Sequence, residues 1–231
     1  MSVLALVLAG PLQSWGSAAR FARRTTEPAP TKSGVLGLLA AAQGRPRTAD
    51  LSDLTALRFG VRVDQRGTRL RDFHTAHRQD NDAAMPVSQR FYLADAVFVA
   101  AVEGDDGLIM ELHRAVRHPE FLPYLGRRSC PPSRPVELAA PQPGPLERVL
   151  TETPWQAAPW QQRRHRDRAE VAVDVLVDAD ADDHHPEPQR DVPLSFDPLH
   201  RRYGLRGFIS RRVHLTNPQA AVRDHDPWSV L

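Results

Sequence analysis

Hydrophobic and polar positions change their spacing along the chain, and the spacing predicts where strands and helices lie. Residues 3–8, with the sequence VLALVL, form an unbroken apolar run, which predicts a strand buried on both faces in the middle of a sheet. Residues 58–64 alternate between apolar and polar or small side chains, which predicts a strand with one apolar face and one largely basic face. A longer strand is expected over residues 91–102.

Two segments have apolar residues at helical spacing, the first at i, i+3, i+4 and i+7 and the second at i, i+4 and i+7. The first begins at Thr31 or Ser33, either of which can cap a helix, and ends near Gly44. The second lies around residues 108–115 and ends before a proline. A short helix is expected directly after Asp50.

Residues 65–88 are polar, contain several arginines and histidines, and lack a periodic apolar face. A segment of this length is too long for an idle connection in a compact domain, so it predicts a functional or disordered insertion. Residues 17–26 mix small, aromatic and basic side chains and are expected to form an exposed, extended arm.

The order of these elements indicates an α+β protein. Together with a further strand expected around residues 135–139, they follow the βαββαβ order of a ferredoxin-like, RRM-like fold. Prolines then become frequent, and clear strands are expected only at residues 170–178 and 205–215. We therefore expect a ferredoxin-like domain over residues 1–140 and a smaller β-rich unit packed on it over residues 141–231.

Composition narrows the class of protein. The chain has 231 residues, of which 41% are hydrophobic and only 6% aromatic, which fits an aliphatic core in one large or two small domains. The single cysteine, Cys130, excludes an internal disulfide. The apolar run at residues 3–8 is far too short to cross a membrane, and no basic segment precedes it. The sequence therefore predicts a soluble cytoplasmic protein.

Charge is unevenly distributed, although the formal net charge is only +2. Acidic residues concentrate in residues 174–187. Arginines gather at positions 20–24, 62–71, 127–128, 163–168 and 201–212. This polarity predicts one face for a polyanion and another face for a different partner, with ordinary solvated surface as the alternative.

Lys32 is the only lysine among the 30 Lys and Arg residues, and it lies at the expected start of the first long helix. Helix N-termini present free N–H groups and a partial positive charge, which hold anions. A lysine there opposes the helix dipole, so we expect its ammonium to contact a phosphate. A solvated lysine is the alternative, because codon bias can explain the scarcity of lysine. A nucleotide-binding P-loop does not fit, because threonines occupy both of its glycine positions.

Candidate catalytic and metal-binding residues are few. The tract DADADDHH at residues 178–185 lacks the glycine and glutamate of an EF-hand loop, so it predicts a solvated loop more than a metal site. Cys130 lies in an expected turn, which disfavours a catalytic thiol. His74 and His77 could act as acid–base groups on an RNA 2′-hydroxyl, although surface hydrogen bonding is the favoured interpretation. No metal or cofactor is expected.

Several unusual motifs follow one another over residues 3–132. They are GPLQSWG at 10–16, PTKSGVLGLL at 30–39, FGVRVD at 59–64, DFHT at 72–75, SQRFYLADA at 88–96 and YLGRRSCPP at 124–132. In this order and spacing the segments resemble the Cas-five family of the RAMP superfamily, which provides a subunit of the type I-E CRISPR Cascade complex. Little beyond residue 140 matches.

The resemblance implies a ferredoxin-like domain with a protruding β-hairpin thumb, for which residues 65–90 have a suitable size and polarity. It implies a non-catalytic role in antiviral defence, in which the protein binds and caps the 5′ handle of the crRNA and links the backbone to the large subunit. The implied partners are crRNA, the CasC backbone subunit, the large CasA subunit, CasE through the RNA, and target DNA through the assembled complex. No membrane and no cofactor are implied.

Matching the residues to this role yields a set of expected RNA contacts. Trp15 lies next to a glycine and can stack on an unpaired base; the alternative is a loop anchor packed on the core. Lys32 and several arginines can bind phosphates, so Lys32→Ala is expected to lower crRNA retention without lowering the melting temperature. The full set is Gln13, Ser14, Trp15, Arg20, Arg23, Arg24, Lys32, Ser33, His74, Thr75, Arg90, Arg127 and Arg128.

Two other functions remain as alternatives. Some subtypes in the same family process RNA themselves, so one alternative is a metal-independent endoribonuclease of CRISPR repeat RNA, with His74 as the residue to test. The other is a stand-alone single-strand RNA-binding protein. Such a protein would bind free RNA tightly and with a strong salt dependence, whereas a Cascade subunit should bind poorly alone.

Overall fold

A computed structural model describes residues 1–17 and 23–221 of the chain. Its main feature is a seven-stranded sheet in the order β10-β11-β9-β4-β7-β1-β8, in which every neighbouring pair is antiparallel. These strands are β1 (Ser2–Ala9), β4 (Arg58–Gln65), β7 (Val97–Gly104), β8 (Gln142–Pro143), β9 (Glu170–Asp178), β10 (Glu187–Ser195) and β11 (Arg202–Thr216). The helices are α1 (Lys32–Ala42), α2 (Ser52–Thr55), α3 (Asp106–Arg117), α4 (Leu146–Glu152) and α5 (Pro159–Arg164). The chain is therefore a mixed α/β protein in which strands predominate.

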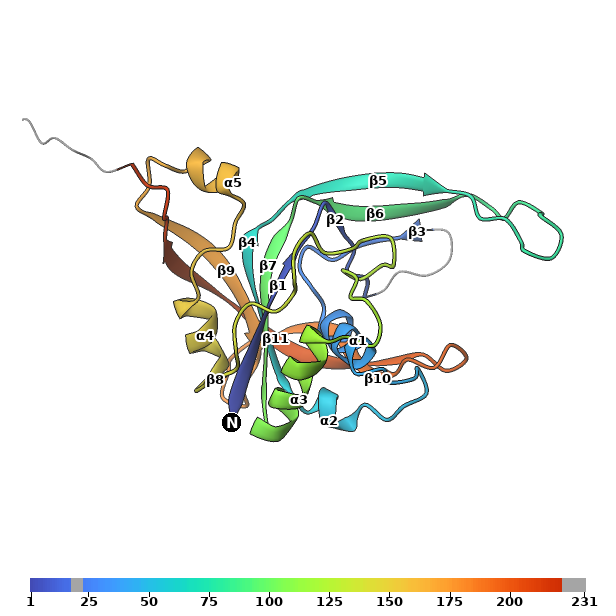
Figure 1. Ribbon diagram of the computed structural model, residues 1–231, viewed down its shortest axis with the longest axis horizontal. Coiled ribbons are helices and arrows are strands. Elements are labelled where there is room, and N and C mark those ends of the chain that lie inside the picture. The colour runs from blue at the N-terminus through green and yellow to red at the C-terminus, as the bar shows by residue number, and fades with distance from the viewer. Residues whose placement is uncertain (18–22, 222–231) are drawn as a thin grey trace, which may run out of the picture.

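The central strands β1 and β7 pair over their full lengths, from Ser2 opposite Gly104 to Ala9 opposite Val97. Alternate side chains of β1 enter different clusters: Leu4, Leu6 and Leu8 pack with α1 and α3, whereas Val3 and Ala5 pack with α4. Figure 1 shows these helices on the two faces of the sheet. Because both faces are covered, the strand reads as an unbroken apolar run, as the sequence predicted.

Strand β4 departs from its prediction, because its second face is not basic and solvated. Gly60 on that face lies so close to α4 that an added Cβ would be 2.6 Å from Leu146 Cδ2. Arg62 is fully buried and bound to Asp64 through both ends of its guanidinium, at 2.7 and 2.8 Å. The carbonyl groups of Leu150, Thr153 and Pro154 accept its remaining hydrogen bonds.

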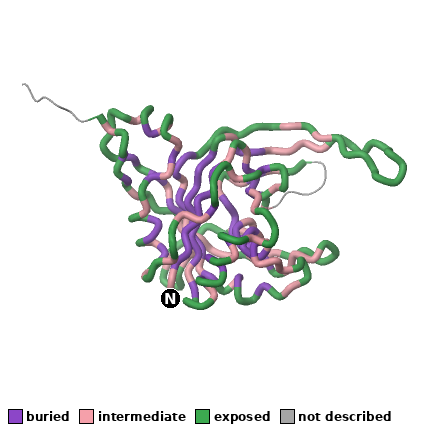
Figure 2. The backbone as a smooth tube through the Cα atoms, in the orientation of Figure 1, coloured by how far each residue is buried: buried purple, intermediate pink, exposed green. Residues whose placement is uncertain are grey.

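A second sheet projects from the first. Its central strand is β6 (Ser88–Ala94), with β5 (Thr68–His74) on one side and the short β2 (Leu12–Gln13) and β3 (Arg23–Arg24) on the other. We call these four strands the projecting sheet. Figure 1 shows β5 and β6 extending well beyond the main sheet as a hairpin, and the loop at its tip, residues 75–87, is exposed throughout (Figure 2).

The single strand expected over residues 91–102 is wrong. Asp95 has a φ of +55°, in the left-handed region that aspartate tolerates better than most residues, and the chain turns there. The turn divides the segment into β6 of the projecting sheet and β7 of the main sheet. This break lets the hairpin leave the core while β7 stays buried.

The C-terminal part joins the main sheet instead of packing on it as a separate layer. Strand β9 pairs with β4 from Gly60 opposite Val177 to Arg62 opposite Val175, and β11 pairs with β9. The strands expected at residues 170–178 and 205–215 are confirmed as β9 and β11. The strand expected at 135–139 is wrong: that segment makes one isolated bridge to β1, and the strand lies at β8. Among the described residues no helix has the length and hydropathy needed to span a membrane.

Candidate nucleic-acid interface

The register of the projecting sheet assigns its side chains to two faces. Residues directly opposite each other on paired strands share a face. One face therefore carries Arg69, Arg71 and Phe73 of β5 with Phe91 of β6, because Arg71 lies opposite Phe91. Arg23 joins it from β3, opposite Gln89.

On this first face, guanidinium groups and aromatic rings are interleaved. The Arg71 guanidinium lies 5.1 Å from the centre of the Phe73 ring, and that of Arg23 lies 5.5 Å from the Phe91 ring. Phe73 is 55% exposed, although an aromatic ring of its size is normally covered in a folded protein. Exposed rings beside arginines can bind unpaired bases by stacking and phosphates by charge.

The opposite face carries Tyr92 and Arg90 of β6 together with Asp72 and His74 of β5. Arg127, from the 126–128 turn, lies over Tyr92 with its guanidinium 4.6 Å from the ring centre. Its Nη2 donates to the backbone oxygen of Arg24 at 2.9 Å. Its Nη1 is buried and has no hydrogen-bond partner among the described residues. His74 binds the Asp72 carboxylate through Nε2.

The arginines of the projecting region differ from those of the main sheet in their pairing. Five of the seven arginines on main-sheet strands bind acidic side chains, whereas Arg190 and Arg202 form no salt bridge with a described residue. The five are Arg58, Arg62, Arg206, Arg211 and Arg212. In the projecting sheet, its tip and the 126–128 turn, no salt bridge joins an arginine to a described carboxylate. Those arginines are Arg23, Arg24, Arg69, Arg71, Arg78, Arg90, Arg127 and Arg128. This region therefore gathers eight arginines whose charge no described carboxylate neutralises by a salt bridge, which suits a polyanion.

A cleft of about 320 Å³ lies where the projecting sheet meets the main sheet. Arg69 and Leu93 line it from the projecting sheet, and Leu176 and Ser210 line it from β9 and β11. The first face of the projecting sheet therefore leads into a concave surface, which can hold a strand against both sheets.

Gln13, Ser14 and Trp15 do not lie on this surface. Trp15 is only 1% exposed, its Nε1 donates to Gln13 Oε1 at 3.0 Å, and its ring leaves no room for a Cβ on Gly34. Gln13 Nε2 donates to the carbonyl groups of Leu8 and Ala96. The Ser14 hydroxyl donates to the Phe91 carbonyl. Of the two alternatives for Trp15, the structure has the loop anchor, and stacking on a base would require the core to open.

Lys32 is also buried, which corrects the expectation of a phosphate contact. Its Nζ lies 2.9 Å from Asp178 Oδ2, and its backbone N–H donates to Asp191 Oδ2 at 2.8 Å. Arg206 binds both of these carboxylates. The anion expected at this helix start is thus present, but it is supplied by the same chain. Ser33 is buried beside the capping Thr31.

The structure gathers part of the expected site. The partly or fully exposed members lie on the projecting sheet, its tip and the adjoining turn; they are Arg23, Arg24, His74, Thr75, Arg90, Arg127 and Arg128. The others are buried: Gln13 within β2 of that sheet, and Ser14, Trp15, Lys32 and Ser33. Arg20 lies outside the described residues. The sequence-based set omitted Arg69, Arg71, Phe73 and Phe91. Their signal was the two-residue period of β5, which puts two arginines and a phenylalanine on one face of the strand.

The structure also bears on two kinds of site considered from the sequence, a catalytic thiol and a metal site. Cys130 is 1% exposed, and burial raises the pKa of its thiol, so it is a poor nucleophile. Among the described residues no group of three or more His, Cys, Asp or Glu side chains is arranged to hold a metal ion.

Comparison with known proteins adds independent information. Residues 3–209 match a family described as CRISPR-associated protein (Cas_Cas5). The CRISPR system Cascade subunit CasD of Escherichia coli (strain K12) is 39% identical over 170 residues, which cover 64% of this chain and 75% of the relative. A chain in a solved CRISPR RNA-guided surveillance complex has a TM-score of 0.78 and 34% identity, covering 97% of this chain and 95% of that chain. A crystal structure of a Cas protein has a TM-score of 0.70 and 35% identity, covering 94% and 97%.

Proposed function

Because the chain belongs to the CRISPR-associated Cas5 family, we propose that it is the Cascade subunit that binds and caps the 5′ handle of the crRNA. The E. coli relative carries the name of a Cascade subunit, and the similar solved chain belongs to an RNA-guided surveillance complex. In this role the protein contributes to antiviral defence. Base pairing between guide RNA and target DNA recognises the target sequence, while the protein subunits bind the sugar–phosphate backbone of the nucleic acid. Its partners are crRNA, CasC, CasA, CasE through the RNA, and target DNA through the assembly.

The observation that carries the proposal is the set of arginines without acidic partners on the projecting sheet. Arg71 beside the exposed Phe73 offers a stacking surface with a phosphate-binding group. Arg127 lies beside the projecting hairpin, is partly exposed, and forms no salt bridge with a described carboxylate. We therefore assign the RNA-binding role to the hairpin of β5 and β6, as the thumb of the family, with the 126–128 turn beside it.

The fold supports the same assignment. The elements β1, α1, β4, β7, α3 and β8 follow the βαββαβ order, with the projecting sheet and α2 as additions, and their strands lie adjacent in the order β8-β1-β7-β4. We interpret this part as a ferredoxin-like domain. The strands β9 to β11 extend it at the edge of β4.

We propose a non-catalytic role for the subunit. His74 and Asp72 form a pair near the RNA surface that resembles an acid–base arrangement, and His77 and Asp82 form another at the hairpin tip. Incubating the purified chain with repeat RNA tests this point directly. Cleavage that His74→Ala abolishes would refute the non-catalytic role and favour the endoribonuclease alternative.

The RNA-binding assignment is tested in the reconstituted complex with the double variant Arg71→Ala/Phe73→Ala. Loss of one stacked base, about 1–3 kcal/mol, predicts roughly 5- to 150-fold weaker crRNA retention. Arg114→Ala on the exposed side of α3 is the matched control, because it also removes a surface arginine. Unchanged retention in the double variant would remove the first face of the projecting sheet from the RNA path.

A further inference from the structure

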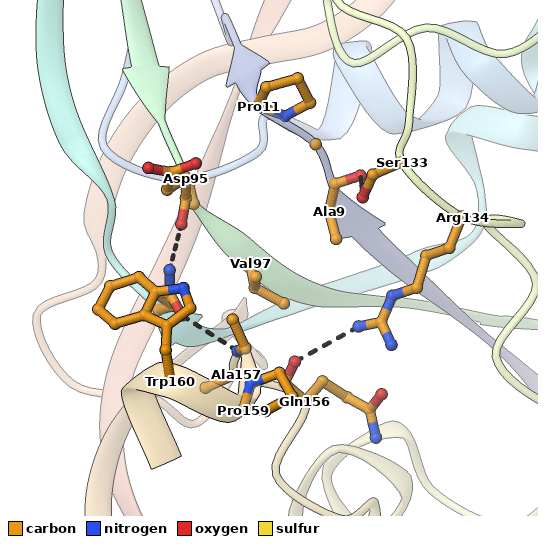
Figure 3. Close-up of a pocket in the computed structure, with 14 residues that line it drawn as sticks. Ala9, Pro11, Asp95, Val97, Ser133, Arg134, Gln156, Ala157, Pro159 and Trp160 are labelled. Atoms are coloured by element: carbon orange, nitrogen blue, oxygen red, sulfur yellow. Dashed lines mark hydrogen bonds between the residues drawn. The ribbon is translucent and has the colours of Figure 1, made fainter. Parts of the chain in front are cut away.

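A second concave site lies on the other side of the projecting hairpin's base. It has a volume of about 460 Å³, within the range typical of ligand and anchor pockets. The ends of β1 and β4, the Asp95 turn, residues 133–134 and the start of α5 form its walls. Figure 3 shows Trp160 and Arg134 on different sides of this pocket, with Val97 between them.

Hydrogen bonds hold the pocket walls in place. Gln65 bridges two of them, because its Nε2 donates to the carbonyl of Asp95 and its Oε1 accepts from the N–H of Ala158 at 3.1 Å (Figure 3). Trp155 Nε1 and the Gln156 N–H donate to Asp64, at 2.9 and 2.6 Å. The segment before α5 is therefore fixed to β4, and the pocket is preformed.

The polar groups of the pocket distinguish between possible occupants. The Gln65 amide is engaged at both of its polar atoms, and the Ser133 hydroxyl donates to the Ala9 carbonyl. A nucleobase is recognised by hydrogen bonds to its edge, and these groups are already committed to their own chain. What the pocket offers is apolar surface, including the Trp160 ring, which is 49% exposed. This chemistry suits an apolar side chain more than a base.

Three arginines and one aspartate lie around the pocket, so its net charge is positive; the aspartate is Asp95, which forms no salt bridge within the described residues. Arg134 forms no salt bridge within the described residues; its side chain donates one hydrogen bond, to the Gln156 carbonyl at 3.4 Å, and partial burial lowers the pKa of its guanidinium. Arg163 and Arg164 follow Trp160 by three and four residues on α5, so they lie on the same side of the helix. Both are exposed and have no acidic partner among the described residues. A partner here must carry negative charge beside its apolar anchor.

We propose that this pocket is a docking site for a neighbouring protein subunit, which inserts an apolar side chain against Trp160 and presents acidic side chains to Arg134 and α5. The proposal rests on the proposed role of the chain in a multisubunit complex. Tryptophan and arginine are the residue types that most often dominate the affinity of such contacts. The site is separate from the arginines of the projecting sheet, so RNA and protein contacts are divided between two surfaces.

The test uses the complex assembled from all subunits and crRNA, with Trp160→Ala and Arg134→Glu in this chain. Native mass spectrometry identifies the subunits that remain, and RNA quantification gives the crRNA content. The expected result is loss of one neighbouring protein subunit, or at least tenfold weaker retention of it, since anchor residues of interfaces commonly contribute this much. The crRNA content should stay unchanged, and Trp160→Phe should retain the subunit.

Leu122→Ala removes another exposed apolar side chain, 83% exposed and outside the pocket, and is the matched control. Retention of every protein subunit by both pocket variants would overturn the proposal. Loss of crRNA while every protein subunit is retained would also overturn it, because that result would indicate a nucleotide site. Protection of the crRNA 5′ handle by the wild-type chain is measured separately. Its absence would refute the proposed function, while loss of a subunit in the variants would still support the docking site.

Discussion

Replacing Lys32 by methionine separates a structural role from an RNA-binding role. The substitution keeps most of the apolar stem and removes the ammonium that lies 2.9 Å from Asp178. The Lys32 side chain is 7% exposed and that of Asp178 16% exposed, so solvent cannot replace the lost contact easily. The backbone N–H of Lys32 still donates to Asp191, and the helix start is preserved.

The expected cost follows from what remains around Asp178. Removing one member of a buried ion pair costs about 3–5 kcal/mol because the other charge loses its partner. Asp178 keeps Arg206 Nη1 at 2.9 Å and the N–H of Phe59 at 3.0 Å, so the lower end, about 3 kcal/mol, applies. For a chain of this size, this corresponds to a fall in melting temperature of roughly 6–12 °C.

Differential scanning calorimetry of the purified chain measures the stability effect, and a double-mutant cycle with Asp178→Asn isolates the pair. A coupling of about 0.5–3 kcal/mol is expected for residues in direct contact. In the reconstituted complex, the slope of log K for crRNA against log salt should stay unchanged. An unchanged melting temperature, combined with a slope smaller by about 0.7, would show that Lys32 neutralises a phosphate and would refute the structural role.

Three further predictions concern the interior. Gly34→Ala should cost about 1–3 kcal/mol of stability, because its Cβ would lie 2.7 Å from Trp15 Cε3; an unaltered thermal midpoint would contradict the packing. Arg62→Met should lower the free energy of unfolding by about 3–5 kcal/mol, measured by urea denaturation, because the Asp64 side chain is 0% exposed and would lose its guanidinium partner. A variant with the same urea midpoint as the wild type would argue against a buried ion pair. Burial raises the pKa of the Cys130 thiol, so iodoacetamide at pH 8 should alkylate it slowly in the native chain and rapidly in urea. Mass spectrometry follows the labelling. Fast labelling of the native chain would mean that the thiol is accessible.

The periodicity of apolar residues located most of the long elements. Strand β1 and helices α1 and α3 lie within a few residues of the segments predicted from it, because each buries a continuous face against the same core. Strand β10 was missed, since Pro188 and Pro193 interrupt its pattern. Prolines are tolerated there because β10 is the edge strand of the sheet, a position that depends on partners distant in sequence.

The candidate site was harder to predict, because residue type alone does not separate an exposed polar side chain from a buried, paired one. Lys32 and Arg127 are both basic residues within unusual motifs. Lys32 meets Asp178, which lies 146 residues away, and is neutralised inside the protein. Arg127 stacks on Tyr92, stays partly exposed, and forms no salt bridge with a described carboxylate. Only the folded arrangement decides which of the two can reach an RNA.

The same long-range contacts bear on how the chain divides into domains. Boundaries between domains fall where few contacts cross. A boundary near residue 140 would separate β4 from its partner β9 and Gly60 from α4. It would also separate Lys32 from both of its carboxylates and leave a buried ammonium without a counter-ion. The match to the Cas5 family extends to residue 209, beyond the point where recognisable motifs end. Residues after 140 therefore complete the fold begun by β1 and α1, because strands β9 to β11 extend the same sheet by pairing.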